Sequence, residues 1–182
     1  MIPAPDSEEG MMTTAAPATI SEVEVLRQQA RMTHKVVQAN LQGVTHEESL
    51  AQPEPGGNCL NWVLGHLLWA YAGVLPLLGQ ESALSKDALK RYERGSSPME
   101  DPAEAIDIQE MLKGWDEATK RMDAGLASLT PEVLDRPAPN SPSGNPNETV
   151  RSLLVTVAFH QAYHAGQTGV LRRVAGKEGA IR

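Results

Sequence analysis

The sequence predicts an all-α protein that folds as a four-helix bundle with at least one long connection. Hydrophobic residues make up 41% of the 182 residues but aromatic residues only 4%, and a core of Leu, Ala, Val and Met favours helices over sheets. Four long segments space their apolar residues as one face of a helix does, and no segment shows the alternation of a strand. The single cysteine allows no intrachain disulfide, so the fold depends on its helical core.

The first two long helices carry recognisable start signals. The first is expected to begin at Ser21, because Glu24 follows it at the spacing of a capping box. The second is expected to begin at Asn58, as its N-cap, and to run to about Leu78, where a glycine follows. We expect Pro76 to end this helix early or to kink its last turn.

The other two long helices lie in the second half of the chain. The third is expected to run from about Asp107, its N-cap, to Leu129. The fourth is expected to begin where Asn145 precedes Pro146, because proline favours the first position of a helix. It should continue to about Ala175, with a glycine after it as the stop signal.

These helices are expected to form one domain with a tail at each end. The bundle spans residues 21–176, after a flexible leader at 1–20 and before a C-terminal tail at 177–182. The long link at 79–105 is expected to contain a small helix at 85–94.

The charge balance excludes some partners. Lys and Arg total 16 against 23 Asp and Glu, a net charge of −7, which argues against binding to a nucleic-acid backbone. Residues 56–80 contain no charged side chain, but only about 17 of them are densely apolar, the low limit for a membrane span. We expect this segment to be a buried helix of a cytoplasmic protein with no membrane partner, because the leader also lacks the positive start of a secretory signal.

The fourth helix carries two histidines one turn apart. His160 and His164 project from the same face, about 6 Å apart along the helix axis, and this face is the apolar stripe expected to point inward. Such a pair can bind one metal ion, although pairs at this spacing also arise by chance and are often only hydrogen-bonded. His66 adds a third imidazole from the uncharged second helix, a poor place for a histidine without a partner. Three inward imidazoles suggest a metal site with open coordination positions, which is typical of catalytic zinc.

Two known kinds of metal site are excluded by the residues around these histidines. In zinc-protease helices a glutamate follows the first histidine and acts as the general base, but Gln161 stands there in this chain. Ferritin-like di-iron bundles need a glutamate three residues before a histidine, and no histidine here has one.

Two segments resemble the signatures of the DinB-like (DinB/YfiT) metalloprotein family: NWVLGHL at 61–67 and FHQAYHAGQ at 159–167. The resemblance implies a bundle of up-down-down-up order with a long crossover, and His66, His160 and His164 as the metal ligands. It implies zinc or nickel as the ion, with manganese or iron as further options. It also implies a homodimer.

The resemblance implies a thiol S-transferase that joins a low-molecular-weight thiol to an electrophile. A divalent ion held by three neutral imidazoles keeps its full charge and would deprotonate a bound thiol. Two alternatives stay open: a non-catalytic metal-binding or interaction module, and a metal-dependent hydrolase, for which the sequence offers no evident proton acceptor.

Three further residues could support the site. Gln167 shares the face of His164 and could orient a ligand or make a polar contact at a helix crossing. Trp62 lies one turn from His66 and is expected to be a core aromatic, with a place in the cleft wall as the alternative. Tyr163 is expected to pack against a neighbouring helix, with a place beside the metal ligands or in the pocket as the alternative.

The remaining candidates are expected to lie outside the metal site. Cys59 would be about 10 Å along the helix from the nearest histidine, although a helix N-terminus can lower the pKa of a thiol. His34 is expected to be structural or partly exposed, and His46 solvated. Arg172 and Arg173 are expected to cap the end of the fourth helix rather than meet an anionic substrate.

Overall fold

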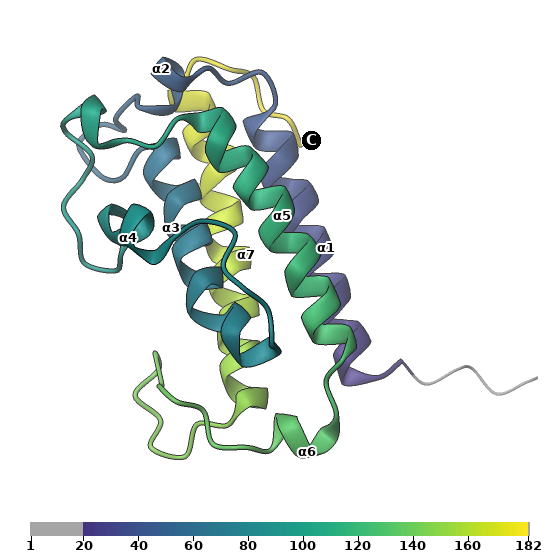
Figure 1. Cartoon of the computed structure of the whole chain (residues 1–182). Coiled ribbons are helices and arrows are strands. Elements are labelled where there is room, and N and C mark those ends of the chain that lie inside the picture. The colour runs from purple at the N-terminus through teal and green to yellow at the C-terminus, as the bar shows by residue number, and fades with distance from the viewer. Residues whose placement is uncertain (1–19, 182) are drawn as a thin grey trace, which may run out of the picture.

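The computed structural model describes residues 20–181, so all but the last residue of the predicted leader lies outside the described part. Four long helices form the bundle (Figure 1): α1 (Glu22–Leu41), α3 (Leu60–Val74), α5 (Ile108–Ala127) and α7 (Val150–Val174). Short helices lie in the connections: α2 (His46–Ser49), α4 (Lys86–Leu89) and α6 (Pro131–Leu134), with 3₁₀ turns at Leu75–Leu78, Lys90–Tyr92 and Pro102–Glu104. Residues 20–181 contain no β-strand. The all-α prediction is confirmed.

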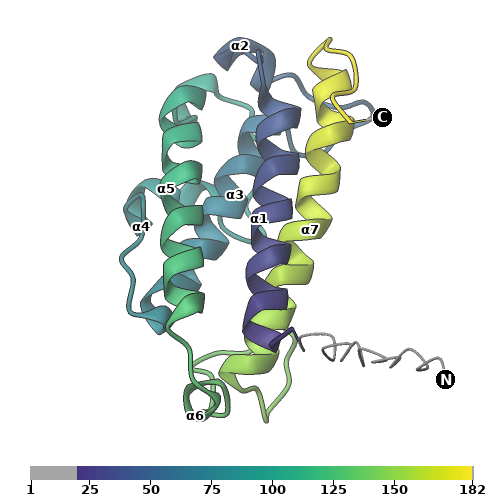
Figure 2. The same ribbon diagram turned by 90° about the vertical axis from the view of Figure 1, so that its right-hand side faces the viewer.

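The bundle has the up-down-down-up order that the resemblance implies. Helices α1 and α7 run toward one end of the molecule, and α3 and α5 run toward the other (Figures 1 and 2). Helix α1 packs on α5 and α7, and α3 packs on the same two helices. Helices α1 and α3 therefore occupy diagonally opposite corners of the bundle. Because α3 and α5 are parallel, residues 79–107 must return along the length of the bundle. We call this segment the crossover.

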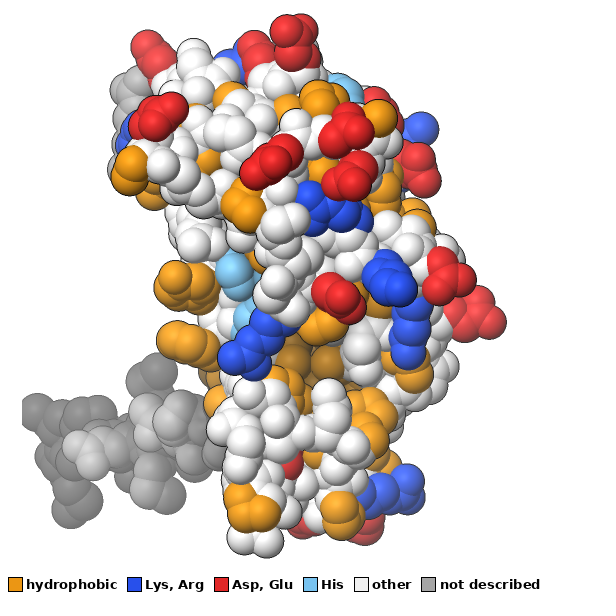
Figure 3. All heavy atoms as spheres, turned by 90° about the vertical axis from the view of Figure 1, so that its left-hand side faces the viewer, with side chains coloured by type: hydrophobic (Ala, Val, Ile, Leu, Met, Phe, Trp, Pro, Cys, Tyr) orange, Lys and Arg blue, Asp and Glu red, His pale blue; other side chains and the backbone are white. Residues whose placement is uncertain are grey.

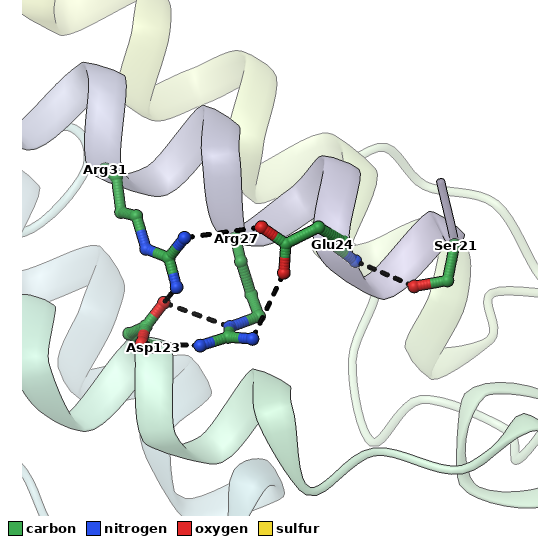
Figure 4. Close-up of polar contacts among 5 residues, drawn as sticks. All are labelled: Ser21, Glu24, Arg27, Arg31 and Asp123. Atoms are coloured by element: carbon green, nitrogen blue, oxygen red, sulfur yellow. Dashed lines mark hydrogen bonds and ion pairs between the residues drawn. The ribbon is translucent and has the colours of Figure 1, made fainter. Parts of the chain in front are cut away.

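The predicted start of α1 is confirmed, but its capping box is only half formed. The Ser21 hydroxyl accepts a hydrogen bond from the backbone N–H of Glu24 at 3.2 Å. The Glu24 carboxylate instead pairs with Arg27 and Arg31 (Figure 4). Both guanidiniums also form ion pairs with Asp123 on α5. The hydrogen bond from Arg27 lowers the pKa of Asp123. This network ties the first half of α1 to the last turns of α5.

Helix α3 begins one residue later than predicted, and its other end agrees with the prediction. Cys59, not Asn58, is the N-cap, and no side chain accepts a hydrogen bond from the first turn. At the other end the α-helix changes to a 3₁₀ turn over Leu75–Leu78, because Pro76 cannot donate to the α-helical ladder. Gly79 then takes a left-handed conformation with φ of 69°, as a helix stop requires.

The predicted start of α7 is wrong. The helix begins at Val150, four residues after Pro146, with Thr149 as its N-cap and Ser152 completing a capping box. A second contact favours this later start: the Glu148 carboxylate accepts hydrogen bonds from loop serines, Ser141 and Ser143, at 2.8 Å. The loop that precedes α7 is therefore folded onto the start of the helix.

The uncharged segment is the core helix of the bundle. Within residues 20–181, Leu60–Leu78 is the one helical stretch long and apolar enough to cross a bilayer, and 72% of its most apolar window is buried inside the fold. A helix that packs on neighbours in this way is consistent with a soluble protein. Its burial also explains why a histidine in it needs partners.

Candidate metal centre

The structure brings together the three histidines that the sequence singles out. His66 on α3 is 4% exposed, and it faces His160 and His164 on α7, which are half-buried. The ring centroids lie 4.5 to 5.0 Å apart, and one nitrogen from each ring lies within 4.8 Å of the others. Figure 3 shows histidine side chains reaching the surface in a hollow, beside hydrophobic side chains that project from it. The cluster is therefore open to solvent on one side.

Hydrogen bonds fix the orientation of two of the rings. The Nδ1–H of His66 donates to the carbonyl oxygen of Tyr92 at 2.7 Å. The Nδ1–H of His164 donates to the Oε1 atom of Gln167 at 2.6 Å. Because carbonyl and amide oxygens only accept, both neutral rings keep the Nε2 lone pair for the centre of the cluster. Gln167 thus orients a proposed ligand, one of the two roles that the sequence left open.

His160 has no comparable support. Its Nδ1 atom is buried and has no hydrogen-bond partner among the described residues, while its Nε2 atom lies 3.0 Å from the Nε2 atom of His66. Two nitrogens on a tetrahedral zinc ion with bonds of about 2.0–2.1 Å would be roughly 3.3 Å apart. The donor set and this spacing fit a divalent ion.

Burial keeps the three imidazoles neutral. Desolvation lowers the pKa of His66 and of His164. Desolvation, followed by the charges of the other two histidines, lowers the pKa of His160 to about 4. Neutral rings at pH 7 have their lone pairs free for a metal ion.

Two indole rings flank His66 on its own helix. Trp62 and Trp69 stack on its imidazole, with ring centroids at 4.7 and 5.4 Å and interplanar angles of 13° and 14°. The Nε1–H of Trp62 donates to the hydroxyl of Ser96 in the crossover at 3.0 Å. Trp62 is therefore both a buried core aromatic and part of the wall of the site.

The crossover holds His66 in place through one close packing contact. A Cβ atom on Gly65 would lie 2.2 Å from the ring of Tyr92, so only glycine allows this ring to rest on α3. The Tyr92 hydroxyl donates to Asn61 at 3.1 Å and accepts from the N–H of Ile106 at 2.7 Å. With its ring anchored in this way, Tyr92 presents its backbone carbonyl to His66.

One expectation about a supporting residue needs correction. Tyr163 does not pack against a neighbouring helix: it is 58% exposed, and its ring lies edge-on to His164 at 5.1 Å. Tyr163 directly precedes His164 on a part of α7 that faces outward, and this places its ring beside the histidine. Cys59 is fully buried, and desolvation raises the pKa of its thiol, which argues against a reactive role at the helix N-terminus.

The other histidines and the arginines lie outside the cluster, as predicted. The Nδ1 atom of His34 is 2.9 Å from the hydroxyl of Thr119 in a contact between α1 and α5. His46 begins α2 and is partly exposed rather than fully solvated. Arg172 does not cap α7 as expected: it donates to backbone carbonyls at the end of α1 and in the C-terminal tail. Arg173 is exposed.

The sequence did not identify the crossover residue that completes the site. Tyr92 acts through its backbone carbonyl, which no side-chain pattern reports. Gly65 gave no decisive signal: a glycine inside a helix can mark a close packing contact, but Gly73 on the same helix has no neighbouring atom within 4 Å of the position of a Cβ. A glycine in a helix also gives no indication of which segment approaches.

The fold and the site define a helical-bundle protein with an inward cluster of three histidines. The model of the DinB superfamily matches residues 14–168, and the chain belongs to this superfamily. A conserved protein from Enterococcus faecalis has the same fold, with a TM-score of 0.66 and 17% identity over 87% of this chain and 100% of that one. Comparison with curated proteins gives no match.

Proposed function

We propose that the chain binds a divalent metal ion through His66, His160 and His164 and transfers a low-molecular-weight thiol to an electrophile. The convergence of three neutral imidazoles from two helices supports this proposal most strongly. The bound ion would supply a full positive charge that favours the thiolate form of the substrate. Membership of a metal-associated superfamily adds support.

The protein residues supply orientation and partial exclusion of water. Tyr92 and Gln167 hold two of the imidazoles, and the indoles of Trp62 and Trp69 form an apolar wall. In the transfer, the substrate sulfur forms a bond to the electrophilic carbon as the bond to the leaving group breaks. The leaving group departs with the electron pair, and the thiol proton passes to solvent.

The choice of metal follows from the donor set. Imidazole nitrogens suit zinc, nickel and iron, whereas manganese prefers oxygen ligands. Among residues 20–181, no carboxylate belongs to the histidine cluster. The donor set therefore disfavours manganese and allows zinc, nickel and iron, and we propose zinc or nickel because the family resemblance favours these two.

The alternative of a metal-dependent hydrolase has less support from the site. Hydrolysis needs a proton acceptor for the attacking water, and no described carboxylate is hydrogen-bonded to the three rings. Gln161 is buried and donates to the carbonyl of Leu67 at 3.1 Å, so it cannot act as the base. A non-catalytic metal-binding module is the other alternative.

Activity of the metal-loaded protein tests the proposal. Protein loaded separately with each metal is incubated with 2-mercaptoethanol and 1-chloro-2,4-dinitrobenzene, and the thioether product is followed by its absorbance. We expect product above background with the native chain and none above background with a His160→Ala, His164→Ala variant, while His34→Ala behaves as the native chain. Equal product from the double variant would contradict the proposal. Ester hydrolysis without thiol would favour the hydrolase, and bound metal without any turnover the non-catalytic module.

The proposal includes a homodimer. The outer face of α7 is apolar and exposed. Residues 152–171 of this helix contain no Asp, Glu, Lys or Arg, and Phe159 near the middle of the face is 72% exposed. The exposed apolar side chains of this face are Val155, Phe159, Tyr163, Val170 and Val174. Such a row is costly in water and favours a covering partner. Light scattering of the full chain should give twice the chain mass, and a monomer mass would contradict this part of the proposal.

A further inference from the structure

A small cavity lies between the four long helices and is lined by none of the clustered histidines. Residues of α1, α3, α5 and α7 all contribute to its lining, and most of them are apolar. The exceptions are three polar side chains from three different helices: Thr33 on α1, Tyr71 on α3 and Gln161 on α7. All three are buried, with exposures of 7%, 2% and 1%. The cavity therefore brings polar groups that are distant in the sequence to one place in the core.

The side-chain amide of Gln161 has an acceptor without a protein partner. Its Nε2 atom donates to the carbonyl oxygen of Leu67 on α3 at 3.1 Å. Because a carbonyl oxygen only accepts, this contact fixes which end of the amide is the nitrogen and which is the oxygen. The Oε1 atom is buried and has no hydrogen-bond partner among residues 20–181. A buried acceptor in this condition destabilises a fold unless a donor reaches it.

The hydroxyls of Thr33 and Tyr71 also lack partners among residues 20–181. By contrast, the buried hydroxyl of Thr119 donates to the carbonyl oxygen of Trp115, four residues before it, at 2.8 Å. Burial raises the pKa of Tyr71, and no hydrogen bond contributes to the shift. The phenol is therefore protonated at neutral pH and able to donate. The cavity thus has one acceptor and two hydroxyls without protein partners.

The size of the cavity limits what it can bind. The space open to the centre of a water molecule is about 20 Å³, and a single water needs about 10–15 Å³ on this measure. A buried water forms about three hydrogen bonds to polar groups that lack other partners. An amide oxygen and two hydroxyls supply that number, since a hydroxyl both donates and accepts.

We propose that the cavity is a binding site for one structural water, which donates to the Oε1 atom of Gln161 and bridges it to the hydroxyls of Thr33 and Tyr71. The water links α1, α3 and α7 through groups that have no other partners. Gln161 directly follows His160, so the bridge also holds the part of α7 that carries a proposed metal ligand. The site is separate from the metal centre, and the inference does not depend on the proposed function.

A crystal structure of the full chain tests the site directly. We expect one density peak for water in the cavity, about 2.5–3.0 Å from the Oε1 atom of Gln161 and from the hydroxyl oxygens of Thr33 and Tyr71. A well-ordered core without a peak between these three atoms would overturn the inference.

Conservative variants test the site in solution. Tyr71→Phe keeps the ring that stacks on Trp115 with centroids at 5.2 Å, and Thr33→Val keeps the branched shape of the side chain, so each removes only a hydroxyl. With the water bound, each variant loses a hydrogen bond, and we expect the equilibrium constant for unfolding to rise about fivefold. Urea titration followed by circular dichroism measures it. Removal of an unpartnered hydroxyl from a dry cavity leaves this constant unchanged or lowers it, and either result would count against the water.

A double variant and a control show whether the two hydroxyls share one ligand. Because both contact the same water, the free-energy change of the Thr33→Val, Tyr71→Phe variant should differ from the sum of the single changes. Strict additivity would mean that the hydroxyls act independently, against the proposed bridge. The matched control is Thr156→Val, on α7 but outside the lining of the cavity, which should change the unfolding constant by no more than about twofold.

Discussion

Replacement of His160 and His164 by alanine is expected to abolish tight binding of a divalent ion. The two substitutions remove two of three ligands, and loss of even an outer-shell partner of a ligand typically costs 10- to 100-fold in metal affinity. We therefore expect a loss of at least about a hundredfold. Isothermal titration of the metal-free protein with zinc and with nickel measures the change directly.

Two controls show whether such a loss is specific. His34→Ala removes an imidazole that contacts Thr119 between α1 and α5, outside the cluster, and should leave the metal affinity unchanged. Circular dichroism should show that the double variant keeps its helices, because His160 and His164 are only half-buried. Native-like affinity in a folded double variant would mean that the ion binds elsewhere.

The second large effect is expected from Gly65→Ala. Its new methyl group would meet the Tyr92 ring at 2.2 Å, and the next nearest ring atoms at 2.4 and 2.5 Å. The ring is held by Asn61 and Ile106 and cannot move without breaking these bonds. We expect a loss of about 3 kcal/mol in the free energy of unfolding, at the upper end for an overpacked core. Urea unfolding followed by circular dichroism measures this loss.

A second glycine on the same helix supplies the matched control. Gly73 has no neighbouring atom within 4 Å of the position of a Cβ, so Gly73→Ala should stabilise the helix by about 0.5–1 kcal/mol. Gly65→Ala should also weaken metal binding, since it displaces the Tyr92 carbonyl from His66. Equal stability of the two variants would contradict the packing that positions this ligand.

The sequence predicts the bundle well where side chains act locally. Ser21 and Asp107 both accept hydrogen bonds at the starts of α1 and α5, because a capping side chain acts within three residues of itself. The start of α7 was misplaced because a local signal at Pro146 competed with a capping box at Thr149. Sequence spacing does not show which of two nearby signals the tertiary contacts support.

The histidine cluster could be predicted for a similar reason. His160 and His164 share a face by helical geometry, and the burial of α3 indicates that His66 points into the core. The order of the helices came from the resemblance rather than from periodicity. Tyr92 reaches the site through the crossover, whose course depends on the packing of a whole segment and not on a repeating pattern.

The most direct test of the central claim is a crystal structure of the zinc-loaded protein, with anomalous scattering recorded at the zinc edge. We expect one strong anomalous peak per chain, about 2.0–2.1 Å from a nitrogen of each of His66, His160 and His164. Density for solvent or buffer should occupy a remaining coordination position. A zinc-containing crystal without a peak between these three rings would contradict the account.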